Sequence, residues 1–406
     1  MPIQQLTLPL LVSQAVRQLR RALRLILLLT LPFYACDQNS GGPVFFGNVK
    51  EVSVGDAHTA AIDKDGKLYV WGNNTYGQLG DAGTTTSLIP VQIRADKNWI
   101  AVSAGYAHTT AIDKDGKLWA WGYNVYGQLG DGSTTNGNVP IQIRADKDWI
   151  AVSAGFSHTV AIDKNGKLWA WGRNLESQLG DGGISGTNSN VPVQIGTKDW
   201  IAVSAGRYHT TAIDKDGKLW AWGSSNCGQL GDNTTAIRSA PVQVGTLAQQ
   251  ALPNWKWIAV SAGELHTAAI AEDGKLWAWG YNGEGQLGDG TSDTKYAPVQ
   301  IRTDKDWIAV SAGGSHTAAI DKDNKLWIWG NNESSQLGIN TIKSGNAPVQ
   351  LGGDRWIAVS ASRYAHTAAI KNDWSLWSWG NNNYGQLGDS TKKAKSTPVK
   401  VILSLE

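Results

Sequence analysis

Near-copies of one phrase occur seven times in this chain of 406 residues, at a period of about 50 residues, most clearly as WIAVSAGYAHTTAIDKDGKLWAWGYNVYGQLGDG from Trp99 to Gly132. Each copy contains one histidine, and successive histidines are 50, 50, 51, 57, 50 and 50 residues apart. Self-similarity at this period is typical of propellers and solenoids, in which a repeat buries its faces only against its neighbours.

Each copy contains four short apolar segments bounded by Gly, Pro, Asn or Asp, and we expect each segment to be a strand. In the second copy they are WIAVSAG, HTTAI, KLWAWG and VPIQI, called here the A, B, C and D strands. No repeat has the 3.6-residue period of a helix. We predict an all-β fold, a seven-bladed β-propeller of four-stranded antiparallel blades. The last copy ends on TPVKVIL (residues 397–403), so we expect this C-terminal strand to complete the first blade and close the ring.

The B–C turns read DKDG in three copies, DKNG in one and AEDG in another, each with Gly at the left-handed position of a hairpin turn. Asn324 and Trp374 replace this Gly in the last two copies, and we expect Trp374 to distort the last hairpin or shift its register. An EF-hand is excluded because the Gly comes too early and the twelfth position lacks Glu.

Trp119 and Trp121 recur as a pair in the C strand, on one strand face. The pair occurs in six copies, with Tyr69 and Trp71 in the first, and this recurrence favours packing between blades over a sugar-stacking ladder.

The first 36 residues read as an export signal. Four arginines precede an apolar run from Leu25 to Ala35, which is too short to span a membrane, and Ala35-Cys36 resembles the cleavage junction of a bacterial lipoprotein. We therefore predict a signal over 1–36 with lipidation at Cys36, a flexible tether over 37–47 and the propeller over 48–406. Soluble secretion and an uncleaved anchor are the alternatives. The expected location is the cell envelope, membrane-anchored.

Charge and cysteine content narrow the function further. Residues 1–35 hold four arginines and no acid, so the rest of the chain has 32 basic and 34 acidic residues, which argues against a nucleic-acid surface.

The two cysteines, Cys36 and Cys227, are 191 positions apart and make no disulfide framework, although a single bridge between them stays possible. Otherwise Cys227 is an unpaired thiol.

The seven histidines occupy one equivalent position in each copy, and each is followed by Thr. Equivalent positions on seven blades cannot share one metal. Neighbouring strands lie about 4.7 Å apart, so seven of them in a ring stand far from its centre. Zinc–imidazole bonds are only about 2.0–2.1 Å long. No copy gives its histidine the distinct partner that a general base needs. We expect a structural group that ties the B strand to a neighbouring backbone carbonyl, and no catalytic residue, metal or cofactor. These residues are His58, His108, His158, His209, His266, His316 and His366.

At this point VSAGYAHTTAI followed by LWAWGYNVYGQLGDG resembles the repeat of the regulator-of-chromosome-condensation (RCC1) family, over about residues 48–403. The resemblance implies a seven-bladed propeller. It also implies guanine-nucleotide exchange on a small GTPase or, among secreted bacterial relatives, inhibition of β-lactamase. Plant members perceive ultraviolet light through Trp in GWRHT, but here GYAHT, GFSHT and GRYHT lack Trp, so we discount that function.

Antiparallel strands place the A–B and C–D loops at one end of the blades, the loop face, and the DKDG turns with the D–A connections at the other, the turn face. The turns are nearly identical between copies, while the loops differ and gather aromatic residues, Arg and Glu. Tyr and Arg are enriched at binding hot spots, and loops on a rigid scaffold carry recognition. The predicted partner-binding residues are Tyr76, Tyr106, Tyr126, Phe156, Arg207, Tyr208, Glu264, Arg363, Tyr364 and Tyr384.

We accordingly expect a non-enzymatic binding module, monomeric, whose loop face meets a protein or cell-envelope partner. The alternative is a regulator of an enzyme, either a small GTPase or a β-lactamase. Drift in unconstrained loops would also produce variation between copies.

Overall fold

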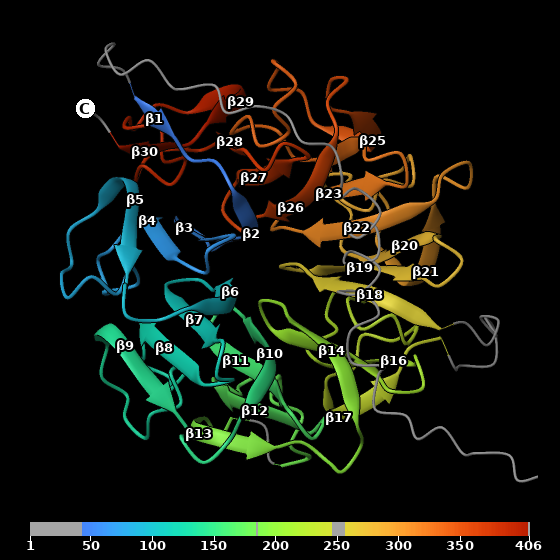
Figure 1. Cartoon of the computed structure of the whole chain (residues 1–406). Coiled ribbons are helices and arrows are strands. Elements are labelled where there is room, and N and C mark those ends of the chain that lie inside the picture. The colour runs from blue at the N-terminus through green and yellow to red at the C-terminus, as the bar shows by residue number, and fades with distance from the viewer. Residues whose placement is uncertain (1–42, 184–185, 246–255, 405–406) are drawn as a thin grey trace, which may run out of the picture. The chain divides into compact units, whose positions relative to one another are not determined.

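The computed structural model describes residues 43–183, 186–245 and 256–404 (Figure 1). Within these ranges every regular element is a strand, and no helix long and apolar enough to cross a membrane is present. Short strands bounded by Gly, Pro, Asn and Asp are what the repeats predict.

Seven antiparallel sheets of four strands follow one another along the chain, each in the order A, B, C, D. The first two blades are β2 (Val49–Val54), β3 (His58–Asp63), β4 (Leu68–Gly72), β5 (Ser87–Ile93) and β6 (Trp99–Ala104), β7 (His108–Asp113), β8 (Leu118–Gly122), β9 (Gly137–Ile143). The third and fourth are β10 (Trp149–Ala154), β11 (His158–Asp163), β12 (Leu168–Gly172), β13 (Ser189–Gln194) and β14 (Trp200–Ala205), β15 (His209–Asp214), β16 (Leu219–Gly223), β17 (Arg238–Gln243).

The fifth and sixth blades are β18 (Trp257–Ala262), β19 (His266–Ala271), β20 (Leu276–Gly280), β21 (Lys295–Ile301) and β22 (Trp307–Ala312), β23 (His316–Asp321), β24 (Leu326–Gly330), β25 (Gly345–Gln350). The seventh is β26 (Trp356–Ala361), β27 (His366–Lys371), β28 (Leu376–Gly380), β29 (Lys395–Lys400). Successive A strands touch one another, and β26 touches β2, so the A strands surround the centre of a closed ring. The predicted seven-bladed propeller is confirmed.

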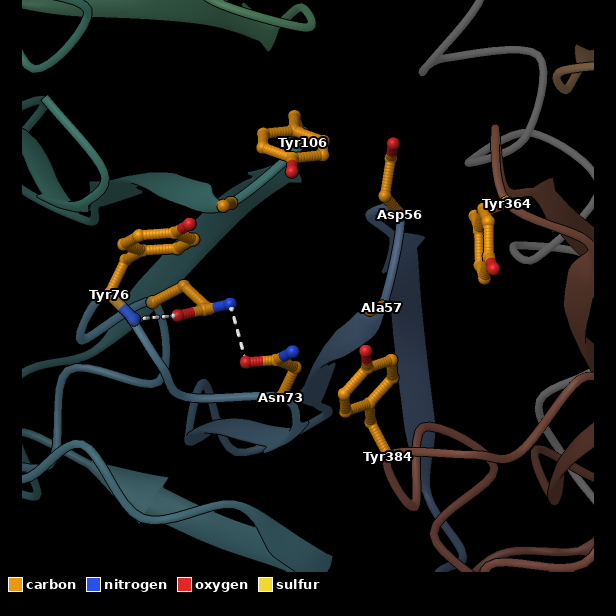
Figure 2. Close-up of a pocket in the computed structure, with 9 residues that line it drawn as sticks. Asp56, Ala57, Asn73, Tyr76, Tyr106, Tyr364 and Tyr384 are labelled. Carbon is orange, nitrogen blue, oxygen red and sulfur yellow. Dashed lines mark hydrogen bonds between the residues drawn. The ribbon is translucent and has the colours of Figure 1, made fainter. Parts of the chain in front are cut away.

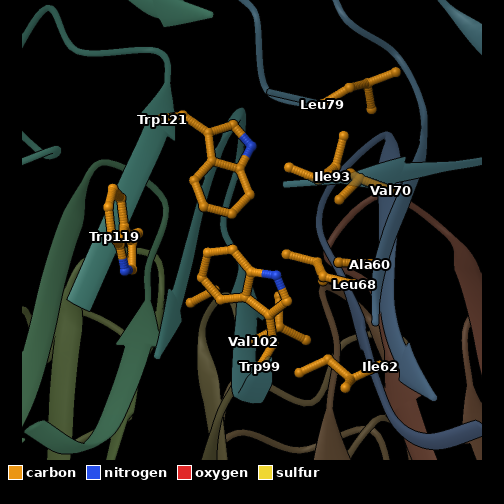
Figure 3. Close-up of a cluster of buried hydrophobic side chains, with 11 residues drawn as sticks. Ala60, Ile62, Leu68, Val70, Leu79, Ile93, Trp99, Val102, Trp119 and Trp121 are labelled. Atoms are coloured by element: carbon orange, nitrogen blue, oxygen red, sulfur yellow. The ribbon is translucent and has the colours of Figure 1, made fainter. Parts of the chain in front are cut away.

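Tryptophans fill the wedges between blades (Figure 3). Trp99, Trp119 and Trp121 of the second blade pack against Ile62, Leu68 and other apolar side chains of the first. Trp121 is fully buried, and its indole meets the Trp99 ring at 6.4 Å. Two rings spaced by two residues share one face of the strand, as predicted, and that face is the joint with the preceding blade.

The ring closes differently from our expectation. The first blade takes all four strands from residues 49–93, and β29 is the outer strand of the seventh blade, so the C-terminus does not supply a strand to the first blade. Each D strand pairs with the C strand of its own repeat. A further C-terminal strand, β30 (Ile402–Ser404), pairs instead with β1 (Val44–Phe45).

Residues 44–46, which we expected to lie in a flexible tether, take part in this closure. Phe46 is 2% exposed and meets the ring of Tyr69 edge-on at 4.8 Å. Its N–H donates to Val401 O at 2.8 Å, and its carbonyl accepts the Leu376 N–H at 3.2 Å. The first blade has Val49 where the other A strands begin with Trp, and Phe46 provides the aromatic ring that this blade lacks.

The last hairpin keeps the register of the others, so the expected distortion is wrong. Trp374 has φ +68°, its N–H bonds Lys371 O at 2.9 Å, and Ile370 pairs with Leu376 as Ile62 does with Leu68. The strands on either side set the register, and the Lys64 ammonium lies 3.6 Å from the Trp374 ring centroid.

We expect the left-handed backbone at Trp374 to cost stability. Trp374→Gly should be more stable than Trp374→Ala by about 1 kcal/mol, because both lose the indole but only Ala keeps a Cβ at positive φ. Urea unfolding of the two variants measures this difference. Gly66→Ala, at the equivalent first-blade position with φ +80°, is the matched control and should lose a similar amount. Equal stability of the two Trp374 variants would show that the turn is unstrained.

Candidate functional site

The seven histidines form a ring of hydrogen bonds between blades. His58 Nε2 lies 2.9 Å from Thr109 Oγ1 of the next blade, and the six other histidines repeat this contact, ending with His366 on Thr59 at 3.0 Å. The Thr109 hydroxyl donates its one proton to Gln78 O at 2.8 Å, so Nε2 must be the donor to Thr109. The partner is therefore a threonine hydroxyl, which relays the contact to a carbonyl, and the direct carbonyl contact we expected is wrong.

Burial makes these histidines poor bases. All are at most 1% exposed, and the Nδ1 atom of each accepts no hydrogen bond from a described residue. Burial lowers the pKa of five of them to about 3 and of His316 to about 4, and lowers the pKa of His158 well below its usual value. No group of three or more His, Cys, Asp or Glu in the described residues could hold a metal ion.

Constant residues hold the variable positions of the C–D loops. The Tyr76 N–H donates to Gln78 Oε1 at 2.9 Å, and the Leu79 N–H donates to Asn74 Oδ1 at 3.0 Å. The same glutamine contact recurs at the equivalent position of every blade. The residue before the GQLG or SQLG motif therefore varies in chemistry but keeps one backbone position.

The A–B loops are joined to one another around the mouth of the ring. The Asp56 N–H donates to Gly105 O of the next blade at 3.3 Å, and the Tyr106 N–H donates to Gly155 O at 3.2 Å. The bond recurs through the loops that begin at Phe156, Arg207, Glu264 and Gly314. The first variable residue of each of the first six loops is thus held by a backbone bond to the next loop.

A strip of aromatic rings crosses the first four blades on the loop face. The ring of Tyr106 is 4.4 Å from that of Phe156, which is 6.2 Å from Tyr208, and Tyr76 joins the strip through Tyr123 at 4.8 Å. These contacts bring together Tyr76, Tyr106, Tyr126, Phe156, Arg207 and Tyr208 of the predicted residues. All six side chains are half-buried.

Arginines lie over this strip. Arg207 stands 4.9 Å from the Phe156 centroid and pairs with Glu264, while Arg173 stands 4.9 Å from Tyr208. Tyr123 and Arg173 were not among the predicted residues. Both occupy the position directly after the C-strand Gly, where the copies also differ, so variation at that position was the available signal.

Arg363 turns into the ring and not toward a partner. The seventh A–B loop has one extra residue, and its Arg363 reaches across the centre to donate from Nη2 to Ala205 O at 2.8 Å. Its Nη1 lies 4.0 Å from Asp56 Oδ1, and its side chain is 12% exposed. Placing Arg363 on the partner surface was therefore wrong. Burial raises the pKa of Asp56 to about 7, against the opposing charges of Arg363 and Arg207.

A pocket of about 140 Å³ opens where the first, second and seventh blades meet on this face (Figure 2). The two remaining predicted tyrosines, Tyr364 and Tyr384, line it together with Tyr76 and Tyr106. Its other lining residues are Asp56, Ala57, Asn73, Gln78 and Ala107.

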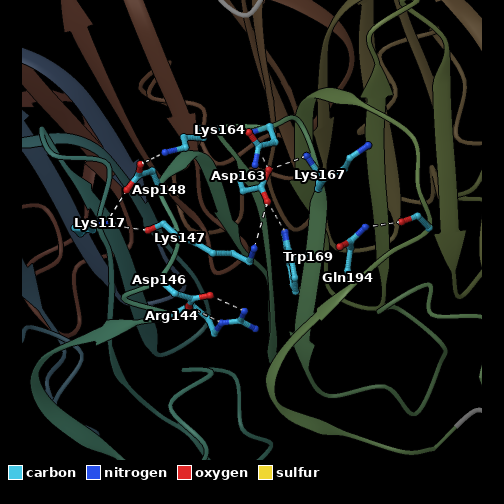
Figure 4. Close-up of polar contacts among 12 residues, drawn as sticks. Lys117, Arg144, Asp146, Lys147, Asp148, Asp163, Lys164, Lys167, Trp169 and Gln194 are labelled. Carbon is cyan, nitrogen blue, oxygen red and sulfur yellow. Dashed lines mark hydrogen bonds and ion pairs between the residues drawn. The ribbon is translucent and has the colours of Figure 1, made fainter.

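The turn face, by contrast, pairs its charges internally (Figure 4). Asp163 accepts two backbone N–H groups of its own turn and the Trp169 indole N–H at 3.1 Å. Asp148 bridges Lys117 and Lys164, and Arg144 is bidentate to Asp146. Asp163 therefore shapes its own hairpin.

Cys227 lies in a C–D loop as a half-buried free thiol, and burial raises its pKa. The thiol that a disulfide would require, Cys36, falls outside the described residues.

Family models match nearly the whole propeller. A model described as RCC1-like domain matches residues 183–406, and two models described as the regulator of chromosome condensation (RCC1) repeat match residues 65–112 and 115–162, and residues 49–78, 99–128 and 149–178. The chain belongs to the RCC1-like family. The resemblance inferred from the repeat is thereby confirmed.

Individual members of this family resemble the chain in different degrees. It is 30% identical to the ultraviolet-B receptor UVR8 of Arabidopsis thaliana over 63% of this chain and 46% of the receptor. It is 35% identical to protein pim1 of Schizosaccharomyces pombe over 24% of this chain and 18% of pim1. The matches thus cover less than half the length of these relatives. Prp20p of Saccharomyces cerevisiae superimposes with a TM-score of 0.71 at 18% identity, over 89% of this chain and 87% of Prp20p, and so shows the shared fold.

Proposed function

We propose that this RCC1-like propeller is a non-enzymatic binding module whose loop face docks a protein partner. The observation that carries the proposal is the strip of half-buried Tyr, Phe and Arg side chains from Tyr76 to Tyr208. Tyr and Arg dominate binding energy at protein interfaces because they bury large area while keeping a polar tip. On the turn face, Asp and Lys side chains already satisfy one another.

Related propellers support a protein partner. The yeast Prp20p structure is described together with its binding to Gsp1p and histones, and a second yeast structure shows Kap60 bound to RCC1 (Prp20). Those statements concern the yeast protein. We carry over only the use of the propeller as a protein-binding scaffold. A partner that proves to be an enzyme with altered activity would make this chain its regulator, the second function that the resemblance implies.

We expect replacement of Tyr106, Phe156, Arg207 and Tyr208 by Ala to abolish partner capture from envelope extracts. Truncation of binding hot spots costs about 2 kcal/mol or more each, and these side chains lie outside the strands. The matched control is the turn-face set Lys64, Lys114, Lys164 and Lys215, also replaced by Ala. Affinity purification followed by mass spectrometry reads the result, and melting temperature checks the fold. Loss of the same partner from the control set alone would place the interface on the turn face.

We also propose that the chain is exported and held at the membrane by a lipid on Cys36, on the strength of the Ala35-Cys36 junction. In a bacterial host, Cys36→Ala should move the protein from the membrane to the soluble fraction. Cys227→Ala is the control and should stay with the membrane. Membrane retention of the Cys36 variant with its first 36 residues intact would favour an uncleaved anchor.

A further inference from the structure

Four of the nine residues that line the pocket between the first, second and seventh blades are tyrosines. In Figure 2, Tyr76 and Tyr106 lie on one side of the space, Tyr384 lies below it, and Tyr364 lies beyond Asp56. The electron-rich faces of aromatic rings attract cations, and several rings around one small space suit a quaternary ammonium group. The volume of about 140 Å³ exceeds the roughly 30 Å³ share of a single water several-fold, so a small organic group has room.

Asp56 supplies a negative charge to the same pocket. Its Oδ1 atom is buried and accepts no hydrogen bond from a described residue. The guanidinium of Arg363 lies 4.0 Å away, but its Nη2 atom is bound to Ala205 O at 2.8 Å. A buried carboxylate is costly while it is ionised, and a cation in the pocket would lower that cost through charge attraction.

The two side-chain amides of the pocket favour a methylated cation over a primary ammonium. Asn73 Oδ1 accepts the Thr75 N–H at 2.8 Å and Gln78 Nε2 at 3.3 Å, while Gln78 Oε1 accepts the Tyr76 N–H. Both amide oxygens are therefore engaged. A primary ammonium brings three N–H donors that need acceptors, whereas a quaternary ammonium brings none.

We propose that this pocket binds a quaternary ammonium ion such as choline, held by the rings of Tyr76, Tyr106, Tyr364 and Tyr384 and by the carboxylate of Asp56. The site goes beyond the proposed partner surface and does not depend on it, because a small cation can be tested on the purified protein alone.

Calorimetric titration of the full chain with choline chloride at pH 8 tests the proposal. The neutral isostere 3,3-dimethylbutan-1-ol has the same shape without the charge, and it should bind at least about tenfold more weakly if ring and carboxylate attraction together exceed about 1.4 kcal/mol. Equal binding of the two compounds, or no choline binding up to about 50 mM, would overturn the proposal. Tighter binding of n-butylammonium than of tetramethylammonium would overturn the preference for a methylated cation.

The pH profile isolates the role of Asp56. Burial places its pKa at about 7, so choline affinity should rise about tenfold between pH 6 and pH 8 as the carboxylate ionises. The charged groups facing it are Arg363 and Arg207, and burial raises the pKa of the neighbouring Tyr106 hydroxyl further above this range. Asp56→Asn should bind weakly with a flat profile. A profile that stays pH-dependent in the variant would remove Asp56 from the site.

Two substitutions of one pocket tyrosine test the site independently if Asp56→Asn fails to fold. Tyr384→Phe keeps the aromatic face and should retain choline binding, whereas Tyr384→Leu should weaken it several-fold. Tyr208→Leu removes a loop-face ring outside the pocket and should bind choline like the parent. Equal affinity of the Phe and Leu variants would contradict the aromatic site, whatever becomes of partner capture.

Discussion

Lowering the pH from 7 to 5 is expected to remove most of the stability of this propeller. The unfolded chain binds a proton at each of seven histidines near pH 6.5, while burial holds the folded-state pKa values at about 3 to 4, and that of His158 well below its usual value. Between these limits the unfolded state binds more protons, so the free energy of unfolding falls as pH falls. The loss is about 2 kcal/mol per histidine at pH 5.

Two carboxyl groups oppose this trend. Burial raises the pKa of Glu51 and Asp56 to about 7, so these groups take up protons in the folded state and stabilise it as the pH falls. Two carboxyl groups oppose seven histidines, so unfolding near pH 5 takes up about five protons.

Urea unfolding between pH 8 and pH 5 measures this uptake as the slope of the free energy against pH. His158→Gln keeps an N–H donor toward Thr210 but cannot be protonated, so its uptake should be smaller by about one proton. A slope near zero would mean that the histidines are charged or solvated in the folded ring, and would contradict their structural role.

The second large effect is expected at the joint between the first and seventh blades. Phe46→Ala should lower the free energy of unfolding by about 3–5 kcal/mol, because it empties a buried site between Tyr69, Trp71 and the C-terminal segment at Val401. Because each blade contacts only its neighbours, the damage falls on the one joint that two distant ends of the chain make together.

Phe45→Ala is the matched control for this substitution. Phe45 is the preceding residue on β1 and is 49% exposed, so its removal should cost well under 1 kcal/mol. Chemical unfolding compares the two variants, and hydrogen exchange should show early opening of β1 and β30 in Phe46→Ala only. Similar losses in both variants would mean that β1 closes the ring through its backbone pairing with β30 alone.

The sequence repeat predicted the blade because the four strands of a blade are close together in the sequence. Each strand lies within about 50 residues of its partners, and the paired C-strand tryptophans, the DKDG turns and the variable loops all follow from periods of two and fifty that the sequence displays directly. Six of the predicted surface residues, from Tyr76 to Tyr208, lie in one aromatic strip, since the same register that repeats the strands also repeats the loops.

Only the tertiary structure revealed the contacts that occur once in the molecule and are not repeated in every blade. Phe46 replaces a tryptophan, β30 pairs with β1, and Arg363 crosses the ring to Ala205, and each of these contacts joins residues more than 150 positions apart. No period marks such contacts, because their geometry exists only after the ring has closed. Each histidine illustrates both cases. Its identical context in every copy predicted a structural role from the sequence. Its partner, a threonine hydroxyl one blade away, depends on how neighbouring blades pack.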